Sequence, residues 1–394
     1  MEFASSPRST VGIEWELQLI DSDSFDLRQS ADAVMDQVEG LDGSHKNIHR
    51  EMLLNTVELV SSPHATIAEC CADLQEGIDT LEPIVTPLRI SLASSGSHPF
   101  ANPTYQRVTD SERYAELVNR TQYWGRQMLL FGTHVHVGVE SRDKVLPILS
   151  ALLTRFAHLQ ALTASSPFWS GLETGYADNR AMVFQQLPTA GSSRQFDTWA
   201  DLERFTDDML HTGVIDNFDE VRWDIRPSPK FGTIELRVCD AASNIAEVGM
   251  VGALSQCLVE HYSRMLDRGE ELPSLPDWFV AENKWRAARY GMDAILILDS
   301  DGNEELVTDT IRRMVDTLAP IARELGCEAE LAVVDDVLRL GAPYQRQLAV
   351  AAAHDGSRDT VVEYMVSEMK AGRPLDPAAF ESQASWNPRS KGWN

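Results

Sequence analysis

The chain has 394 residues, of which 43% are hydrophobic and 24% are charged, so it can bury a large core and is too apolar to be disordered. Its formal net charge is −26 and its pI is about 4.7, a balance that repels nucleic acids and anionic membranes. These numbers argue against nucleic-acid and membrane partners.

The N-terminal stretch MEFASSPRST lacks the apolar segment of a signal peptide, and the apolar burst AILIL at 294–298 has the length of a strand. The five cysteines are odd in number and form no CxxC pair. This pattern is typical of reduced thiols in a core rather than of disulfides or a zinc knuckle. We therefore expect a cytoplasmic protein.

Hydrophobic periodicity predicts alternating strands and helices along the chain. Strands are expected at 11–20, 54–60, 130–139, 221–226 and 231–238. Helices are expected at 66–82, 141–160, about 245–266 and most of 304–370. Pro83 should end or kink the first helix. We find no repeat or clear linker, so one catalytic domain over 1–394, with a helical C-terminal part at about 304–380, is the simplest organisation.

The predicted strands share an apolar face and a polar face, because side chains alternate along a strand. In VGIEWELQLI, from residue 11, Glu14 and Glu16 lie opposite the apolar side chains, and in FGTHVHVGV, from residue 131, His134 and His136 do so. Taken over the five strands, the polar face holds Glu14, Glu16, Glu58, His134, His136, Asp224, Arg226, Glu235 and Arg237. If the strands form one sheet, these side chains build one surface.

For any single strand, a solvated sheet face explains such residues well. The five segments together contain no lysine, however, and two histidines on one valine-rich strand are more typical of ligands than of surface residues. Carboxylates suit Mg²⁺ or Mn²⁺, and Arg226 and Arg237 can hold a phosphate or carboxylate. Carboxylates, metal and arginine are the components of phosphoryl transfer. Since neither GxxxxGK[ST] nor GxGxxG occurs, metals and arginines would hold any nucleotide phosphates.

One alternative is a metalloenzyme that does not use ATP. HVHVGVE, from His134 to Glu140, matches the HxHxxxE half-motif of cupin metal sites, which indicates a cupin-like or hydrolytic enzyme using His134 and His136. The second cupin motif is missing, and the following stretch is predicted to be a helix rather than a strand. A binding protein without catalytic activity, built on the same sheet, is a third interpretation.

Six motifs in order resemble the glutamate–cysteine ligase type 2 family, whose members are ATP-dependent carboxylate–amine ligases. They are TVGIEWELQLID, GSHPFA, FGTHVHVGV, DNRAMVFQQLPTAG, FGTIELRVCDA and NKWRAARYGMDA. The resemblance implies an α+β, glutamine-synthetase-like fold, with a curved antiparallel β-sheet that has a polar catalytic face and is backed by helices.

The resemblance also implies a two-step reaction that needs ATP and Mg²⁺ or Mn²⁺. The γ-phosphate of ATP passes to a carboxylate, typically the γ-carboxylate of glutamate, and an amine, typically that of cysteine, attacks the acyl phosphate. Activity with cysteine is expected to be weak, so another amine can be the true acceptor. A homodimer is one possible assembly.

The resemblance assigns roles to individual residues. Arg237 matches the arginine that steadies the transferred phosphate, and Arg180 resembles the one that grips the amino-acid carboxylate. We add Arg226 as a second catalytic arginine. The expected metal ligands are Glu14, Glu16, Glu58, His134 and Glu235.

Several residues have an ordinary structural explanation beside a functional one. Residues Asn283, Arg286 and Arg289 contact ATP or form pairs on a helix surface, with equal weight given to both. We expect His98 to order its loop. Glu51 is either a metal ligand or a solvated residue, and we favour the second. Asp224 is adjacent enough in sequence to pair with Arg226.

Overall fold

The computed structural model describes residues 1–41, 47–110 and 112–382. A seven-stranded sheet with the strand order β10-β11-β5-β1-β3-β2 forms its centre, and β4 pairs with the far end of β1. All pairings in this sheet are antiparallel. Its strands are β1 (Val11–Asp21), β2 (Ile48–Arg50), β3 (Thr56–Val60), β4 (Ile90–Ala93), β5 (Thr133–Gly138), β10 (Ile225–Ser228) and β11 (Thr233–Leu236).

Helices lie on both sides of this sheet. They are α1 (Ala31–Glu39), α2 (Ile67–Val85), α3 (Glu112–Thr121), α4 (Arg142–Leu152), α5 (Phe156–Thr163), α6 (Asn179–Phe184), α7 (Trp199–His211), α8 (Ile245–Asp267), α9 (Asp277–Tyr290), α10 (Val307–Leu325), α11 (Glu328–Leu340), α12 (Pro343–Ala353) and α13 (Arg358–Ala371). The minor strands are β6 (Phe168–Trp169), β7 (Leu172–Glu173), β8 (Ala190–Gly191), β9 (Arg222–Trp223), β12 (Ile295–Ile297) and β13 (Glu304–Leu306).

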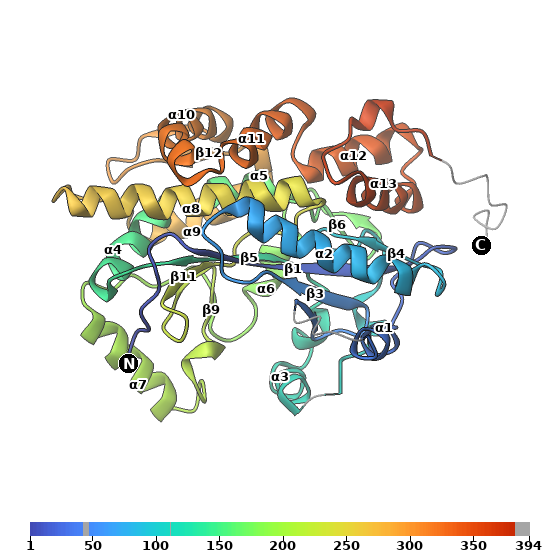
Figure 1. The fold of residues 1–394 in the computed structure, drawn as a ribbon, viewed down its shortest axis with the longest axis horizontal. Coiled ribbons are helices and arrows are strands. Elements are labelled where there is room, and N and C mark those ends of the chain that lie inside the picture. Colours follow the sequence, from blue (N-terminus) through green and yellow to red (C-terminus); the bar gives the residue numbers. More distant parts are fainter. Residues whose placement is uncertain (42–46, 111, 383–394) are drawn as a thin grey trace.

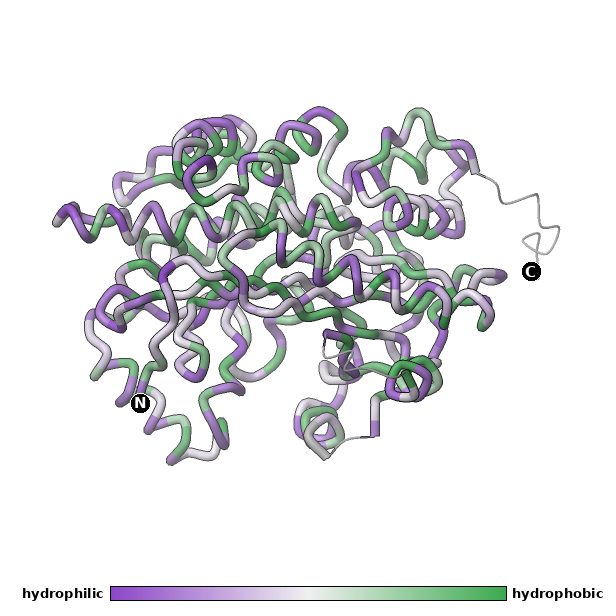
Figure 2. Tube along the Cα trace, in the orientation of Figure 1, coloured by the Kyte–Doolittle hydropathy of each residue, from purple (hydrophilic) through white to green (hydrophobic). Residues whose placement is uncertain are grey.

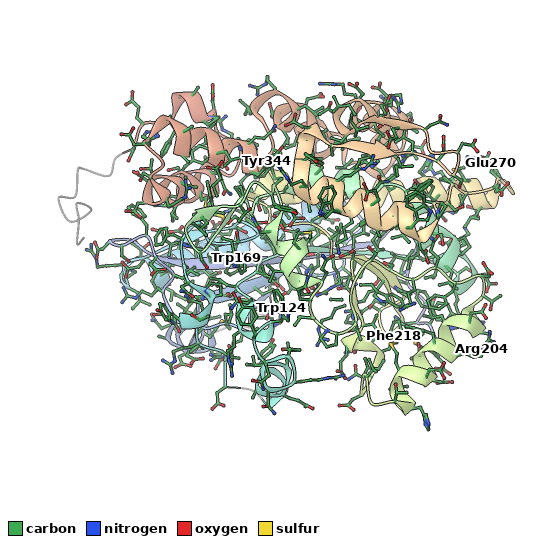
Figure 3. The ribbon with its side chains drawn as sticks, turned by 180° about the vertical axis from the view of Figure 1, so that it is seen from behind. Trp124, Trp169, Arg204, Phe218, Glu270 and Tyr344 are labelled. Carbon is green, nitrogen blue, oxygen red and sulfur yellow. The ribbon has the colours of Figure 1, made fainter. Side chains whose placement is uncertain are left out.

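The molecule is layered around the sheet. Helices α2 and α8 cover one face, α10 to α13 form a further layer beyond them, and α1, α3 and α7 lie on the opposite side (Figure 1). Seen from behind, Tyr344 and Glu270 belong to the helical layers, whereas Trp124 and Phe218 lie on the other side of the sheet (Figure 3). One face of the sheet is therefore closed by helices, and the other is only flanked by them.

The apolar face of β1 explains this arrangement. Its alternate side chains from Val11 to Leu19 are buried against α2 and α8, and the indole of Trp15 donates hydrogen bonds to Ser94 and to the carbonyl of Ala242 at 3.0 and 2.9 Å. Helix α8 is buried along most of its length because it lies between the sheet and the outer helices. The hydrophobic stretches accordingly concentrate in the centre of the molecule (Figure 2).

The helix predictions hold with two differences. Helix α2 begins at a capping box formed by Thr66 and Glu69, as its sequence favours, but continues to Val85, two residues beyond Pro83. The single helix predicted at 141–160 was wrong, because α4 and α5 are separated by a bend of 59°. At this bend the Thr154 hydroxyl donates to the carbonyl of Ala151 at 2.7 Å and competes with the helical hydrogen bonds.

The strand predicted at 221–226 is divided at Asp224. Its first half, β9, pairs with β8, and its second half, β10, pairs with β11. The other four predicted strands and the helices at 245–266 and 304–370 are confirmed. The organisation as one domain stays a prediction.

One expectation from the sequence concerns the cysteines. All five cysteines are free, in agreement with the predicted reduced thiols, and the sulfurs of Cys257 and Cys327 lie 3.6 Å apart.

Within the described residues no single helix has the length and apolar character of a membrane span, and the bent pair α4 and α5 meets both criteria only when the two are taken together.

Candidate active site

The register of the sheet brings the predicted polar residues together. Glu14 on β1 lies opposite His134 on β5, and Glu16 lies opposite Glu58 on β3. On the next strand, Glu235 lies opposite His136. The alternation seen in separate segments therefore becomes one continuous polar surface across β3, β1, β5 and β11.

Glu14 is held between two imidazoles. Its carboxylate oxygens lie 3.0 Å from His134 Nδ1 and 3.4 Å from His136 Nε2. Burial alone would raise the pKa of Glu14, but the hydrogen bonds from both histidines outweigh burial and hold the pKa well below its usual range. Glu14 is therefore an ionised carboxylate at neutral pH, which is the form that binds metal ions.

His134 is a neutral imidazole. Burial, assisted by the charge of Arg237, lowers its pKa to about 4. Its Nδ1 faces Glu14, and its Nε2 lies 3.4 Å from Arg180 Nη2. The neighbouring His136 is oriented by a contact of 2.9 Å between its Nδ1 and the hydroxyl of Thr233. A neutral, oriented imidazole is the form of histidine that ligates metals.

Glu235 is almost completely buried and is held by two arginines. Arg226 Nε donates to its carboxylate at 2.6 Å, and Arg237 Nη1 forms an ion pair with its second oxygen. Burial raises its pKa, but the charges of Arg237, His136 and Arg226 outweigh burial and leave the pKa far below its usual range. Glu235 thus links the two predicted catalytic arginines to β5, the strand that carries His134 and His136.

A third group of acids, Glu16, Glu51 and Glu58, lies on the same face of the sheet, toward β3. Burial and the charge of Glu51 raise the pKa of Glu16 to about 8 and that of Glu58 well above its usual range. Glu16 accepts a hydrogen bond of 2.6 Å from the amide of Gly132, whereas no group among the described residues donates one to Glu58. Carboxylates that repel one another, one of them without a donor among the described residues, are arranged for a cation that neutralises them.

These residues form three overlapping sets of possible metal ligands. Within each set, one ligand atom per residue lies within 4.8 Å of the others. The sets are Glu14–Glu58–His134, Glu14–His136–Glu235 and Glu16–Glu51–Glu58. Oxygen atoms dominate all three, a composition that fits Mg²⁺ or Mn²⁺ better than softer metals.

Glu51 is a correction to the sequence analysis, which placed it in solvent. It is half-buried, lies in the third acid set, and accepts a hydrogen bond of 3.3 Å from the hydroxyl of Tyr114 on α3. It follows β2 directly, where no strand alternation applies. In the sequence, only its nearness to Glu58 along the chain indicated that Glu51 lies close to the other acids.

Arg180 joins the site from α6. Its guanidinium donates to the carbonyl of Arg237 at 3.2 Å, contacts His134, and lies 5.7 Å from the ring of Phe184. Arg237 itself is buried at its Nε atom, which has no hydrogen-bond partner among the described residues. The three predicted arginines, Arg180, Arg226 and Arg237, therefore border the carboxylate sets.

The predicted pairing of Asp224 with Arg226 was wrong. Asp224 accepts a hydrogen bond of 2.7 Å from Lys284 on α9, and both side chains are buried. Arg226 binds Glu235 instead. Because Asp224 is already neutralised by a lysine, it does not belong to the carboxylate sets.

The three residues considered for ATP contacts on α9 have other partners in this structure. Asn283 is buried and exchanges two hydrogen bonds of 2.8 Å with the backbone of Ile297. Arg286 binds Glu282 and Glu304, and Arg289 binds the carbonyl of Gly175. These contacts favour structural roles, and the predicted contacts with ATP stay predictions.

The loop role predicted for His98 is confirmed. Its Nε2 contacts the carbonyl of Phe25 at 3.0 Å, and its Nδ1 accepts from the amides of Phe100 and Ala101. The cupin half-motif is not assembled, because Glu140 leaves the strand after Gly138 and pairs with Lys144 at 2.6 Å.

A cavity opens beside the third acid set. Glu16, Glu51, Thr56 and Arg237 line one part of it. The remainder is lined by Met52, Leu53, Tyr114, Leu117, Met128, Leu130, Phe184, Leu187 and Arg222. The site thus combines carboxylates, imidazoles and arginines with an adjoining space that polar and apolar side chains line in similar measure.

Solved structures with a similar fold support the predicted fold class. The glutamate–cysteine ligase of Francisella tularensis, solved in complex with AMP, has a TM-score of 0.61 at 15% identity, covering 96% of this chain and 91% of that chain. A bifunctional glutathione synthetase from Pasteurella multocida has a TM-score of 0.63 at 15% identity, covering 92% of this chain and 52% of that chain. The predicted α+β fold, a curved antiparallel sheet backed by helices, is confirmed.

Sequence comparison identifies the family. "Putative glutamate--cysteine ligase 2-1" of Arthrobacter sp. (strain FB24) is 50% identical over 378 residues, covering 94% of this chain and 99% of that protein. "Putative glutamate--cysteine ligase 2" of Mycobacterium tuberculosis (strain H37Rv) is 51% identical over 369 residues, covering 94% of this chain and 97% of that protein. The family model for glutamate-cysteine ligase family 2 (GCS2) matches residues 10–364. The chain belongs to glutamate-cysteine ligase family 2.

Proposed function

We propose that this protein is an ATP-dependent carboxylate–amine ligase that activates the γ-carboxylate of glutamate as an acyl phosphate and joins it to an amine. The observation that carries the proposal is the meeting of three carboxylate-rich sets with three arginines on one sheet face. The names of the family relatives point to the same class of reaction.

The carboxylate sets fit divalent cations. Glu58, which lacks a donor among the described residues, and Glu16, whose pKa is raised to about 8, both gain from a neighbouring positive charge. Residues Glu14, Glu16, Glu58, His134 and Glu235 would hold Mg²⁺ or Mn²⁺, and the structure adds His136 and Glu51 to this list. When bound, such ions neutralise phosphate oxygens and favour phosphoryl transfer.

The arginines supply fixed positive charge around the reacting groups. Arg237 and Arg226 would stabilise the phosphoryl group during transfer, because both present guanidinium groups beside Glu235. Arg180 would bind a carboxylate of the amino acid. Its contacts with His134 and with the Arg237 backbone keep it oriented toward this face.

The proposed reaction has two steps. In the first, an oxygen of the glutamate γ-carboxylate forms a bond to the γ-phosphorus of ATP, and the bond from that phosphorus to the β-phosphate oxygen breaks to release ADP. In the second, the amine nitrogen bonds to the acyl carbon, the bond from carbon to the phosphate oxygen breaks, and inorganic phosphate leaves. The amine loses a proton to a carboxylate of the acid sets. Holding the reactants together accounts for much of the expected acceleration.

The test is glutamate-dependent release of ADP from purified protein with ATP, Mg²⁺ and hydroxylamine, together with detection of γ-glutamyl hydroxamate. Formation of both products is expected, because hydroxylamine traps an acyl phosphate without needing a specific acceptor site. A tightly bound transition metal with no ADP release under any combination of amino acid and amine would overturn the proposal in favour of a metalloenzyme that does not use ATP.

A further inference from the structure

We infer that the amine acceptor of this enzyme carries an extended apolar substituent, which binds in the cavity beside Glu16. This inference rests on the proposed ligase function and specifies its second substrate. The acceptor would be a primary amine whose nitrogen reaches the acid end of the cavity and whose carbon chain or ring lies against the apolar walls.

The two ends of this cavity differ in chemistry. Its polar end is part of the candidate active site, because Glu16 and Arg237 line both. Its walls come from separate segments, namely the link between β2 and β3, α3, the chain leading into β5, and the end of α6 with the residues that follow it. The apolar side chains of these walls are Met52, Leu53, Leu117, Met128, Leu130, Phe184 and Leu187.

The apolar wall is tied directly to the reacting end. The ring of Phe184 lies 5.7 Å from the guanidinium of Arg180, one turn earlier on the same helix. Arg180 in turn contacts His134. On the opposite side, Tyr114 donates to Glu51, which holds α3 and its Leu117 over the same space. An acceptor that fills the cavity therefore places its two ends against groups whose positions are fixed relative to each other.

The apolar substituent of the acceptor is expected because apolar wall side chains are less favourable in water than in contact with a ligand. A short polar amine leaves the exposed parts of the half-buried wall residues in water, whereas an alkyl or aryl substituent covers them. These half-buried residues are Met52, Leu117, Leu130 and Phe184. Each buried methylene favours binding by roughly three- to four-fold. Glutamate is poorly suited to the apolar end of the cavity, because its second carboxylate would place a charge there. Arg180 offers that carboxylate a better position.

The test compares ethylamine, butylamine and hexylamine as acceptors with glutamate, ATP and Mg²⁺. Their amino groups are equally basic, so only chain length changes. We expect kcat/KM for γ-glutamyl alkylamide formation to rise by at least about ten-fold from ethylamine to hexylamine. Replacement of the wall residue in Leu117→Ala should flatten this dependence. The matched control Leu210→Ala, at an exposed leucine on α7, should preserve it.

Three results would overturn the inference, and they differ from one another. Hydroxamate formation with no preference for longer amines would leave the ligase in place and disprove the apolar acceptor. An increase in KM for ATP rather than for hexylamine in Leu117→Ala would show that the cavity binds the adenine base. Absence of hydroxamate and of all alkylamides would disprove the proposed function, and the acceptor with it.

Discussion

Two regions of this molecule bury carboxylates beside arginine, and they do so in opposite ways. In the helical layer, Arg346 on α12 is completely buried between Glu247 on α8 and Glu368 on α13, at 2.9 and 2.8 Å. Asn244 donates to Glu247, and Tyr364 and the amide of Leu375 donate to Glu368. The three charged side chains are 2% exposed or less, and none of them lines the cavity that Leu375 borders.

The polar face of the sheet is different because its acids are not all satisfied by the protein. Glu58 has no donor among the described residues, and Glu16 and Glu51 lie within the same acid set. A cavity opens directly onto that set. The comparison teaches that buried charge alone does not mark a functional site; incompletely paired charge beside accessible space does.

The largest expected effect is on stability, in the helical layer. Arg346→Met would leave Glu247 and Glu368 buried without their shared partner, and we expect a loss of about 3–5 kcal/mol in the free energy of unfolding. Urea titration measures this loss. Arg312→Met, which removes an exposed arginine paired with Asp309 on α10, should change it by less than about 1 kcal/mol. Equal effects of the two variants would show that the buried network is not structural.

The second prediction separates activity from stability by using two similar carboxylates. Glu235 and Glu260 are both buried and both held by two arginines, Glu260 by Arg8 and Arg264 at 2.7 and 2.6 Å. Only Glu235 lies in the candidate site. We expect Glu235→Gln to lower hydroxamate formation by at least about 10²-fold and Glu260→Gln to retain it, at comparable losses of stability. The readouts are steady-state kinetics and thermal unfolding of both variants.

Full activity of Glu235→Gln would contradict the assignment of this residue as a metal ligand. A similar loss of activity in Glu260→Gln would show that the assay responds to general destabilisation. The change to glutamine keeps the volume and one acceptor oxygen. In both variants it removes the charge and replaces the second acceptor with a donor that faces a guanidinium, so the two losses are matched.

The third prediction concerns the repulsion among the site carboxylates. Glutamine at position 16 keeps the acceptor for the Gly132 amide but cannot ionise. Because burial and Glu51 raise the pKa of Glu16 to about 8, the metal-free wild type stays protonated there at neutral pH at a cost in stability. Glu16→Gln should therefore stabilise the metal-free protein, by roughly 1–3 kcal/mol.

The same variant should lose the stabilisation that Mg²⁺ gives the wild type. The ion must displace a proton from Glu16, so the affinity of the wild type for Mg²⁺ should rise with pH until about pH 8. Thermal unfolding with and without Mg²⁺, at several pH values, measures both effects. Destabilisation of the metal-free protein by Glu16→Gln would contradict the proposed repulsion.

How much of this site the sequence predicts depends on whether a residue lies in a regular strand. Alternation along β1 and β5 placed Glu14, Glu16, His134 and His136 on one face, and the register of the sheet confirmed it. Alternation fails where a strand stops. Glu140 has the same parity as His136, but β5 ends at Gly138, so its side chain leaves the face.

The features that were missed depend on a distant partner or on local geometry that hydrophobic periodicity does not describe. Asp224 has the right parity for the polar face, yet Lys284, 60 positions away, removes it from the site. Glu51 lies between β2 and β3, where no period constrains the direction of its side chain. The division of the 141–160 helix depends on the Thr154 hydroxyl, which competes for a backbone carbonyl of the helix. Hydrophobic periodicity does not reveal such a contact.

The smallest expected effect belongs to a buried group that is fully paired and lies outside the carboxylate sets. Burial lowers the pKa of His98 to about 3, although its hydrogen bond to Phe25 opposes the shift, and the unfolded chain has a value near 6.5. Below about pH 6.5 the unfolded state takes up a proton that the folded state does not. The stability contributed by neutral His98 is therefore present above this pH and is lost as the pH falls toward 3. The expected loss is about 1.4 kcal/mol per pH unit.

In His98→Asn, whose side-chain oxygen can still accept from the Ala101 amide, the slope of unfolding free energy against pH between about 6 and 4 should be smaller by this amount. Urea titrations at a series of pH values measure the slope. An unchanged slope would show that His98 is solvated or protonated in the folded protein. It would then no longer be an example of complete pairing, in contrast to Glu58, which has no donor among the described residues.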